Sequence, residues 1–234
     1  MTIHKALLSA VSALCLAALA CSLADNTSST PAVSSELADI TSSAPVVSPE
    51  AERTLFSDDF SSTSSGWDQE DYGTGKTDYL DGTYQIQVNE ANFDYWANPG
   101  LSFDDVVVDV DTILGGGPVD NDFGVICRYQ DTDNFYALLI SSDGMYGIYR
   151  NQTGETMMLG QDGMLPSEAI HTDTPDNHVT ASCIGSVLTL SVNGQQVVQV
   201  TDSAFSSGDV GLLAGSFDSP GVDMRFDNFV VTKP

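Results

Sequence analysis

Hydrophobic and polar residues alternate with a period of two along most of the chain from Phe56 onward. No segment of this region keeps an apolar period of 3.6 residues over three helical turns, so the pattern does not indicate helices. Alternation of this kind buries one face of a strand and leaves the other face in water. Clear examples are Tyr84, Ile86 and Val88, then Val106, Val108 and Val110, and then Leu188, Leu190 and Val192. The pattern predicts an all-β domain.

Turn sequences separate these runs. The dipeptides Asp81-Gly82, Asp143-Gly144 and Asn193-Gly194 stand between strand-like segments and accept the positive φ angles of two-residue hairpins. About a dozen short strands at this spacing predict a sandwich of two antiparallel sheets. We expect at most one helical turn, over residues Leu165 to Ile170.

The first twenty residues have a different pattern. Lys5 precedes an apolar run from Ala6 to Ala20, which is shorter than an ordinary transmembrane helix and is typical of an export signal. The run ends Ala17-Ala18-Leu19-Ala20-Cys21, which resembles the lipobox of bacterial lipoproteins. The resemblance implies that residues 1–20 are removed and that an acylated Cys21 anchors the protein in a membrane. The alternative is ordinary signal cleavage at the same place, which would leave Cys21 as an exposed thiol.

Residues 21–54 contain Ser, Thr, Ala, Pro and scattered acids, but no aromatic residue and no glycine. Such a segment cannot bury enough apolar surface to fold, and its prolines stiffen it. We therefore expect a disordered linker that holds a single β-sandwich, residues 55–234, away from the lipid surface.

The charge of the chain excludes one class of partner. The sequence has 33 Asp and Glu against 7 Lys and Arg, a formal net charge of -26, so it cannot replace the counterions of a nucleic acid. Hydrophobic residues still make up 41% of the chain, which is enough for a folded core. The acidic surroundings also favour a neutral ligand over an anionic one.

Two of the four cysteines remain for the folded domain. Cys15 lies in the signal peptide and Cys21 is the proposed lipid site, which leaves Cys127 and Cys183. Both lie in alternating, strand-like runs, and an exported protein meets an oxidising compartment, so we expect a disulfide between them. The alternative is two buried free thiols that pack as small hydrophobic side chains.

Several segments spread over the domain share the pattern of one superfamily. They are Phe56–Phe60 with Gly66-Trp67, Asp122–Tyr129, Asn134–Tyr136, Leu188–Gly194, Gly208–Leu212 and Phe226–Val231. Together they resemble the concanavalin A-like jelly rolls, in particular laminin-G-like domains and the 3-keto-disaccharide hydrolase family. The resemblance implies a jelly-roll sandwich over nearly all of residues 55–234. It implies no single activity, because the superfamily includes lectins, carbohydrate-binding modules, hydrolases and adhesion domains.

The sequence lacks the familiar catalytic motifs. A laminarinase-type enzyme of this superfamily would show Glu-x-Asp-x-Glu on one strand, and no such segment occurs. Gly-x-Ser-x-Gly and His-Glu-x-x-His are missing as well. His171 and His178 flank a loop rich in Thr, Asp and Pro, and we interpret them as exposed turn residues. A non-catalytic domain is favoured, although two aspartates can in principle serve in hydrolysis.

Two aspartates are candidate metal ligands. Asp59 lies in the first predicted strand and Asp227 in the last. The resemblance implies a structural calcium ion here, because related jelly rolls often hold one where the two ends of the domain meet, and carboxylates suit that ion. The alternative is that both are turn or edge residues on an acidic surface. The sequence indicates no other cofactor.

Sugar recognition needs aromatic faces that stack on the sugar ring and planar polar groups that bind its hydroxyls. The candidate ligand-binding residues are Tyr95, Trp96, Asp122, Arg128, Tyr136 and Tyr146. If Val125, Cys127 and Tyr129 point into the core, a period of two places Arg128 on the exposed face of the same strand. Trp67, close to the first strand, is assigned to the core.

The sequence thus predicts an exported lipoprotein, anchored at a bacterial cell surface or in the periplasm, whose jelly-roll sandwich binds a neutral glycan without cleaving it. One alternative is a glycoside-processing enzyme of the 3-keto-disaccharide hydrolase type. The other is an adhesion or scaffolding domain with no small ligand.

Overall fold

A computed structural model describes residues 53–234 of the chain. The predicted signal peptide, the lipid site Cys21 and almost all of the linker lie outside the described residues. Within 53–234 every regular element is a β-strand, and no helix has the length and apolarity to cross a membrane. The strands form two antiparallel sheets stacked as a sandwich, which is the fold class that the alternation predicted.

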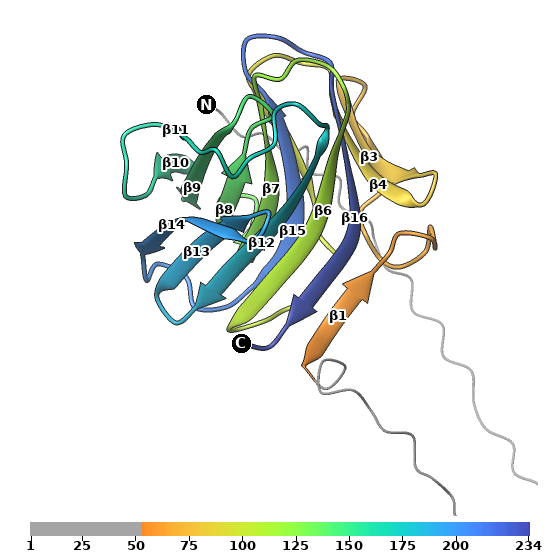
Figure 1. Cartoon of the computed structure of the whole chain (residues 1–234). Helices are drawn as coiled ribbons and strands as arrows, with labels where there is room; N and C mark the ends of the chain where they lie inside the picture. Colours follow the sequence, from red (N-terminus) through yellow and green to blue (C-terminus); the bar gives the residue numbers. More distant parts are fainter. Residues whose placement is uncertain (1–52) are drawn as a thin grey trace, which may run out of the picture. The chain divides into compact units, whose positions relative to one another are not determined.

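The first sheet has nine strands. They are β1 (Thr54–Asp58), β2 (Glu70–Asp71), β3 (Gly75–Leu80), β4 (Thr83–Val88), β6 (Val106–Gly116), β12 (Asp176–Ile184), β13 (Val187–Val192), β14 (Gln195–Thr201) and β16 (Val222–Thr232). Their order is β14, β13, β12, β6, β16, β4, β3 and β2, and β1 also pairs with β16. The long strands β6 and β16 lie side by side (Figure 1).

The second sheet has seven strands. They are β5 (Phe93–Ala97), β7 (Asn121–Asp131), β8 (Asn134–Ile140), β9 (Met145–Gln152), β10 (Glu155–Met158), β11 (Leu165–Pro166) and β15 (Asp209–Ser216). Their order is β10, β9, β8, β7, β15 and β5, with β11 paired to β9. The helical turn predicted from Leu165 is wrong, because this segment begins as the short strand β11 and ends in a turn.

All three predicted hairpins are present, and two of them have the predicted two-residue turn. Asp81 and Asn193 have φ angles of 51° and 49°, and the glycines after them also have positive φ, so β3–β4 and β13–β14 are joined by two-residue turns. The connection between β8 and β9 is longer and comprises residues 141–144. There Ser141 donates its hydroxyl to Asp143 at 2.6 Å and its backbone N–H to Met145 O at 2.8 Å.

The main core lies between the sheets and is built from alternate residues of their strands. Val106, Val108 and Val110 of β6, for example, are almost completely buried in it. Trp67 belongs to the same core, as predicted, because it packs edge-on against Phe229 with ring centroids 4.9 Å apart. Its indole N–H donates to Asp58 Oδ2 at 3.0 Å, so its polar atom is satisfied on burial.

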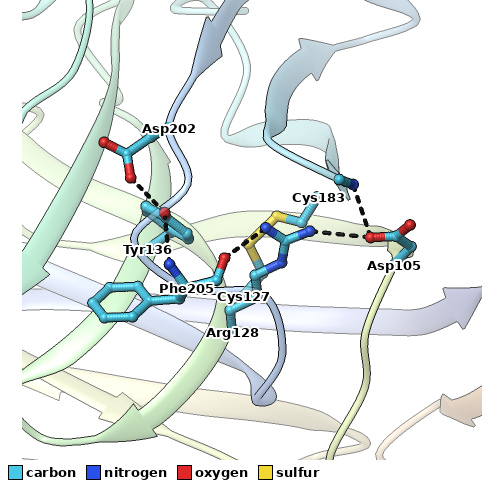
Figure 2. Close-up of a disulfide and its surroundings, with 8 residues drawn as sticks. Asp105, Cys127, Arg128, Tyr136, Cys183, Asp202 and Phe205 are labelled. Atoms are coloured by element: carbon cyan, nitrogen blue, oxygen red, sulfur yellow. Dashed lines mark hydrogen bonds and ion pairs between the residues drawn. A yellow bond between two sulfur atoms is a disulfide. The ribbon is translucent and has the colours of Figure 1, made fainter.

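A disulfide joins the two sheets across the core. Cys127 of β7 and Cys183 of β12 are bonded to each other, and both are fully buried (Figure 2). The predicted pairing is confirmed, and the alternative of two free thiols is wrong. Because the two residues are 56 positions apart in the sequence, the bond closes a long loop of the unfolded chain.

Candidate functional site

The face of the second sheet that points away from the main core is apolar rather than wet. Its central strands read as nearly continuous hydrophobic runs, which is typical of strands buried on both faces. A second buried cluster lies on this face, and we call it the platform. It comprises Trp96, Ile126, Phe135, Ala137, Leu139 and Leu213, with the half-buried Tyr129 and Tyr149 packed against it.

The platform has an aromatic centre. Phe135 of β8 lies between Trp96 of β5 and Tyr129 of β7, with ring centroids 5.6 Å and 5.8 Å away. Burial raises the pKa of the Tyr129 hydroxyl, while a hydrogen bond with Trp96 lowers it. Tyr129 and Tyr149 are the aromatic rings of the platform that remain partly exposed, so they are the ones that a ligand can reach.

A groove of about 450 Å³ adjoins the platform and shares Tyr149 with it. Its apolar walls come from Met145, Met158, Met164 and Phe217. Its polar residues include Asp120, Asp143 and Asp218. Flexible thioethers and an aromatic ring beside carboxylates can contact both the apolar face and the hydroxyl groups of a neutral ligand.

Two carboxyl groups meet beside the platform, where β5 and β7 flank β15. Gly215 of β15 pairs with Asp94 on one side and with Asp122 on the other. A Cβ atom at Gly215 would lie 2.1 Å from Asp94 Oδ1 and 2.2 Å from Asp122 Oδ1. Because both oxygens lie this close to the same point, the distance between Asp94 Oδ1 and Asp122 Oδ1 cannot exceed the sum of these two distances. Glycine leaves the space in which they meet.

These carboxyl groups are strongly perturbed by their surroundings. Burial raises the pKa of Asp122 to about 7, and the charge of Asp120 adds to this shift. Burial also raises the pKa of Asp94 well above its usual range, and the charge of Asp122 adds to it. Since each group disfavours ionisation of the other, the pair retains a proton near neutral pH.

The structure brings only some of the predicted ligand-binding residues together. Trp96 and Asp122 lie on the platform side of the second sheet, although both are almost fully buried. Tyr95 and Tyr136 point the other way, into the main core, and Tyr146 packs against that core half-buried. Each of these three tyrosines has the inward position in the alternation of its own strand, so none of them contributes to the platform, and a role for them in ligand binding stays a prediction.

The prediction that Arg128 is exposed is also wrong. The side chain is 1% exposed and donates to Phe205 O at 2.8 Å and to Asp105 Oδ1 at 3.1 Å (Figure 2). The reason is a bulge in β7, where Arg128 has a φ of 53° and the pairing with β8 shifts after Cys127. A bulge interrupts the period of two. Tyr129, which the alternation assigned to the core, consequently lies on the platform.

The two ends of the domain meet as expected, because β1 pairs with β16. Asp59 accepts hydrogen bonds from the backbone and the hydroxyl of Ser61, and Asp227 accepts one from the backbone N–H of Asn228. Among residues 53–234 no group of three or more His, Cys, Asp and Glu side chains is placed to hold a metal ion. Calcium at Asp59 and Asp227 stays a prediction.

His178 is not the exposed turn residue that its sequence context indicated. It lies in β12, where its Nδ1 is 2.7 Å from Asp111 Oδ1 and its Nε2 is 3.3 Å from Asp109 Oδ1. Burial lowers the pKa of His178, but these two aspartates outweigh that effect and raise it. A polar pocket of about 510 Å³ on this sheet also includes His171 and Asp227.

The sequence interpretation missed Asp94 as a site residue. Asp94 lies in β5 next to Trp96. The sequence does contain a period-two pattern that indicates a strand with two different faces here. One face carries Phe93, Tyr95 and Ala97, and the other carries Asp94 and Trp96. The close approach of Asp94 to Asp122 could not be predicted from the sequence, because β5 and β7 are neighbours only through β15, which pairs with both.

Comparison with known proteins agrees with this fold. Neither a family model nor a curated protein sequence matches the chain. Among solved structures, the chain is similar to the carbohydrate binding module CBM66 from Bacillus subtilis, with a TM-score of 0.58 and 16% identity over 72% of this chain and 96% of that one.

Two further solved structures are similar to the chain. The beta-glucanase from Bacillus licheniformis has a TM-score of 0.54 and 10% identity over 76% of this chain and 98% of that one. A GH43 protein from Bacillus licheniformis has a TM-score of 0.56 and 13% identity over 76% of this chain but only 39% of that one. These likenesses show that the described residues form a concanavalin A-like sandwich, as the resemblance in sequence implied.

Proposed function

We propose that the sandwich binds a neutral glycan, without cleaving it, on the platform and in the groove beside it. The observation that carries this proposal is the second apolar cluster on the outer face of the sheet, with Tyr129 and Tyr149 partly exposed over it. Half-exposed aromatic rings present flat apolar faces for sugar rings, and the acidic groove offers acceptors for hydroxyl groups.

The structural neighbours support the same class of ligand at the level of the fold. They include a carbohydrate-binding module and two proteins named as a beta-glucanase and a GH43 protein. A shared fold does not transfer an activity, so the choice between binding and hydrolysis rests on the geometry of the carboxyl groups.

That geometry favours binding over hydrolysis. Paired-carboxylate hydrolases separate their two carboxyl groups by about 5 to 9.5 Å, so that the scissile bond fits between them. Asp94 and Asp122 approach more closely than this, and they are only 4% and 1% exposed. A glycosidic bond cannot enter the space between them.

The proposal includes the position of the protein in the cell. An acylated Cys21 would hold the domain at a membrane surface, and the linker would let it reach polysaccharides around the cell. The lipobox-like sequence before Cys21 supports this part.

Affinity electrophoresis in gels that contain barley β-glucan, xylan or mannan tests the binding. We expect retardation of the wild type in at least one gel and about tenfold weaker binding for Tyr149→Ala, since loss of one stacking ring costs roughly 1.4 kcal/mol. A wild type that no neutral polysaccharide retards would refute the function.

Two neighbouring methionines provide a matched control. Met158 of β10 lines the groove, whereas Met157 is 47% exposed and does not line it. We expect Met158→Ala to weaken binding and Met157→Ala to leave it unchanged. Equal retardation of the two variants, together with full binding by Tyr149→Ala, would move the site to another part of the protein.

A further inference from the structure

Among residues 53–234, no basic side chain lies in the cavity of the carboxyl pair over Gly215. Asp94 Oδ1 and both carboxyl oxygens of Asp122 accept no hydrogen bond from another residue. The cavity beside them has a volume of about 20 Å³, and its described lining residues are apolar, acidic or uncharged polar. Two buried carboxylates this close cannot both be charged at low cost unless a cation lies beside them.

The described residues that line the cavity come from several strands, and none of them carries a positive charge. Tyr149 and Asn151 come from β9, Thr156 comes from β10, and β8 and β15 contribute only apolar residues and Gly215. Asp120 adds a negative charge just before β7. Burial raises the pKa of the Tyr149 hydroxyl, and the charges of Asp122 and Asp94 add to it, so Tyr149 stays neutral beside them.

We propose that Asp94 and Asp122 form a proton-linked subsite that takes a single hydroxyl group of the neutral glycan into the cavity over Gly215. This inference rests on the proposed function and names the chemistry by which the site recognises its ligand. The protonated carboxyl group donates a hydrogen bond to the hydroxyl oxygen, and the ionised carboxylate accepts the hydroxyl hydrogen.

The size of the cavity limits what can enter. About 20 Å³ corresponds to roughly one water molecule, so a hydroxyl or hydroxymethyl group fits and a sugar ring does not. A ligand carboxylate in the same place would add a second negative charge directly beside the ionised carboxylate of the pair. Loss of the last proton leaves two acceptors and no donor, so the ligand is released as the pH rises.

The test compares Asp122→Asn with Asp162→Asn. The first variant removes one of the two ionisations of the pair, and the second removes an exposed carboxylate outside the cavity lining. Retardation in gels that contain barley β-glucan, xylan or mannan is measured from pH 5 to pH 9. Binding by the wild type and by Asp162→Asn should fall at alkaline pH by up to about tenfold per pH unit, because one bound proton is required. Binding by Asp122→Asn should be weaker at pH 6 but nearly independent of pH.

A second measurement needs no ligand. The folded wild type keeps a proton that the unfolded chain releases near pH 4, so its stability against urea should fall as the pH rises from about 4 to 7. Asp122→Asn should remove much of this slope. The same urea unfolding curves are measured with added calcium, to test whether a cation rather than a proton compensates the charge of the carboxyl pair.

The outcomes separate the two proposals. Retention of the wild type with the same pH profile as Asp122→Asn overturns the subsite and leaves the proposed function standing. No retention of the wild type on any of the three polysaccharides overturns the proposed function, and with it the ligand part of the subsite. Equal pH slopes of stability in wild type and Asp122→Asn, or stabilisation by calcium that Asp122→Asn abolishes, overturn the shared proton.

Discussion

Breaking the Cys127–Cys183 bond should cost much of the stability of the sandwich. The bond joins β7 and β12 across 56 positions of sequence, so its loss returns the entropy of a long open loop to the unfolded chain. For a loop of this length the chain-entropy relation gives about 4 kcal/mol at 25 °C. For a domain of this size that corresponds to a fall in melting temperature of roughly 8 to 16 °C.

The assay is thermal and urea unfolding of the oxidised and the reduced protein. Because both cysteines are fully buried, the protein is reduced in denaturant and refolded with reductant present. The double variant Cys127→Ala/Cys183→Ala is the control, since its melting temperature should not respond to reductant. If oxidised and reduced wild type unfold at the same temperature and the same urea concentration, the entropy argument is wrong.

Further substitutions test other parts of the structure. Arg128→Met should lower the free energy of unfolding by about 1 to 3 kcal/mol in urea, because it leaves the carbonyl of Phe205 without its donor, and unchanged stability would contradict that role. The folded protein raises the pKa of His178, so this residue should stabilise the domain below the unfolded pKa near 6.5, and the stabilisation should be lost as the pH rises through the folded pKa. Parallel profiles of unfolding free energy against pH for the wild type and His178→Gln would disprove this. Gly215→Ala should destabilise the domain by roughly 1 to 3 kcal/mol, since the new methyl group overlaps two carboxyl oxygens, and wild-type melting would show that they move aside. Cys21→Ser should move the protein from the membrane to the soluble fraction, whereas an unmodified N-terminus in the intact mass of the wild type would exclude the anchor.

The sequence alone determined the fold class and favoured the disulfide over two free thiols. Period-two alternation in runs such as Val106 to Val110 has only one structural solution, a strand with one buried face, and many such strands must stack as sheets. The disulfide was predicted by elimination, because Cys127 and Cys183 were the cysteines left in strand-like segments once Cys15 and Cys21 were assigned to the predicted signal peptide and lipid site. Both inferences depend on local pattern and composition, which a single sequence contains.

Tertiary structure decided which side chains lie on the candidate binding face. The bulge in β7, which has one extra residue relative to β15, buries Arg128 and turns Tyr129 outward. This depends on how β7 pairs with β8 and β15. Asp94 and Asp122 are 28 positions apart in the sequence. They meet only because Gly215, which belongs to a third strand, lies between them. The order of strands in a sheet is set by long-range packing, so these contacts leave no periodic signal in the sequence.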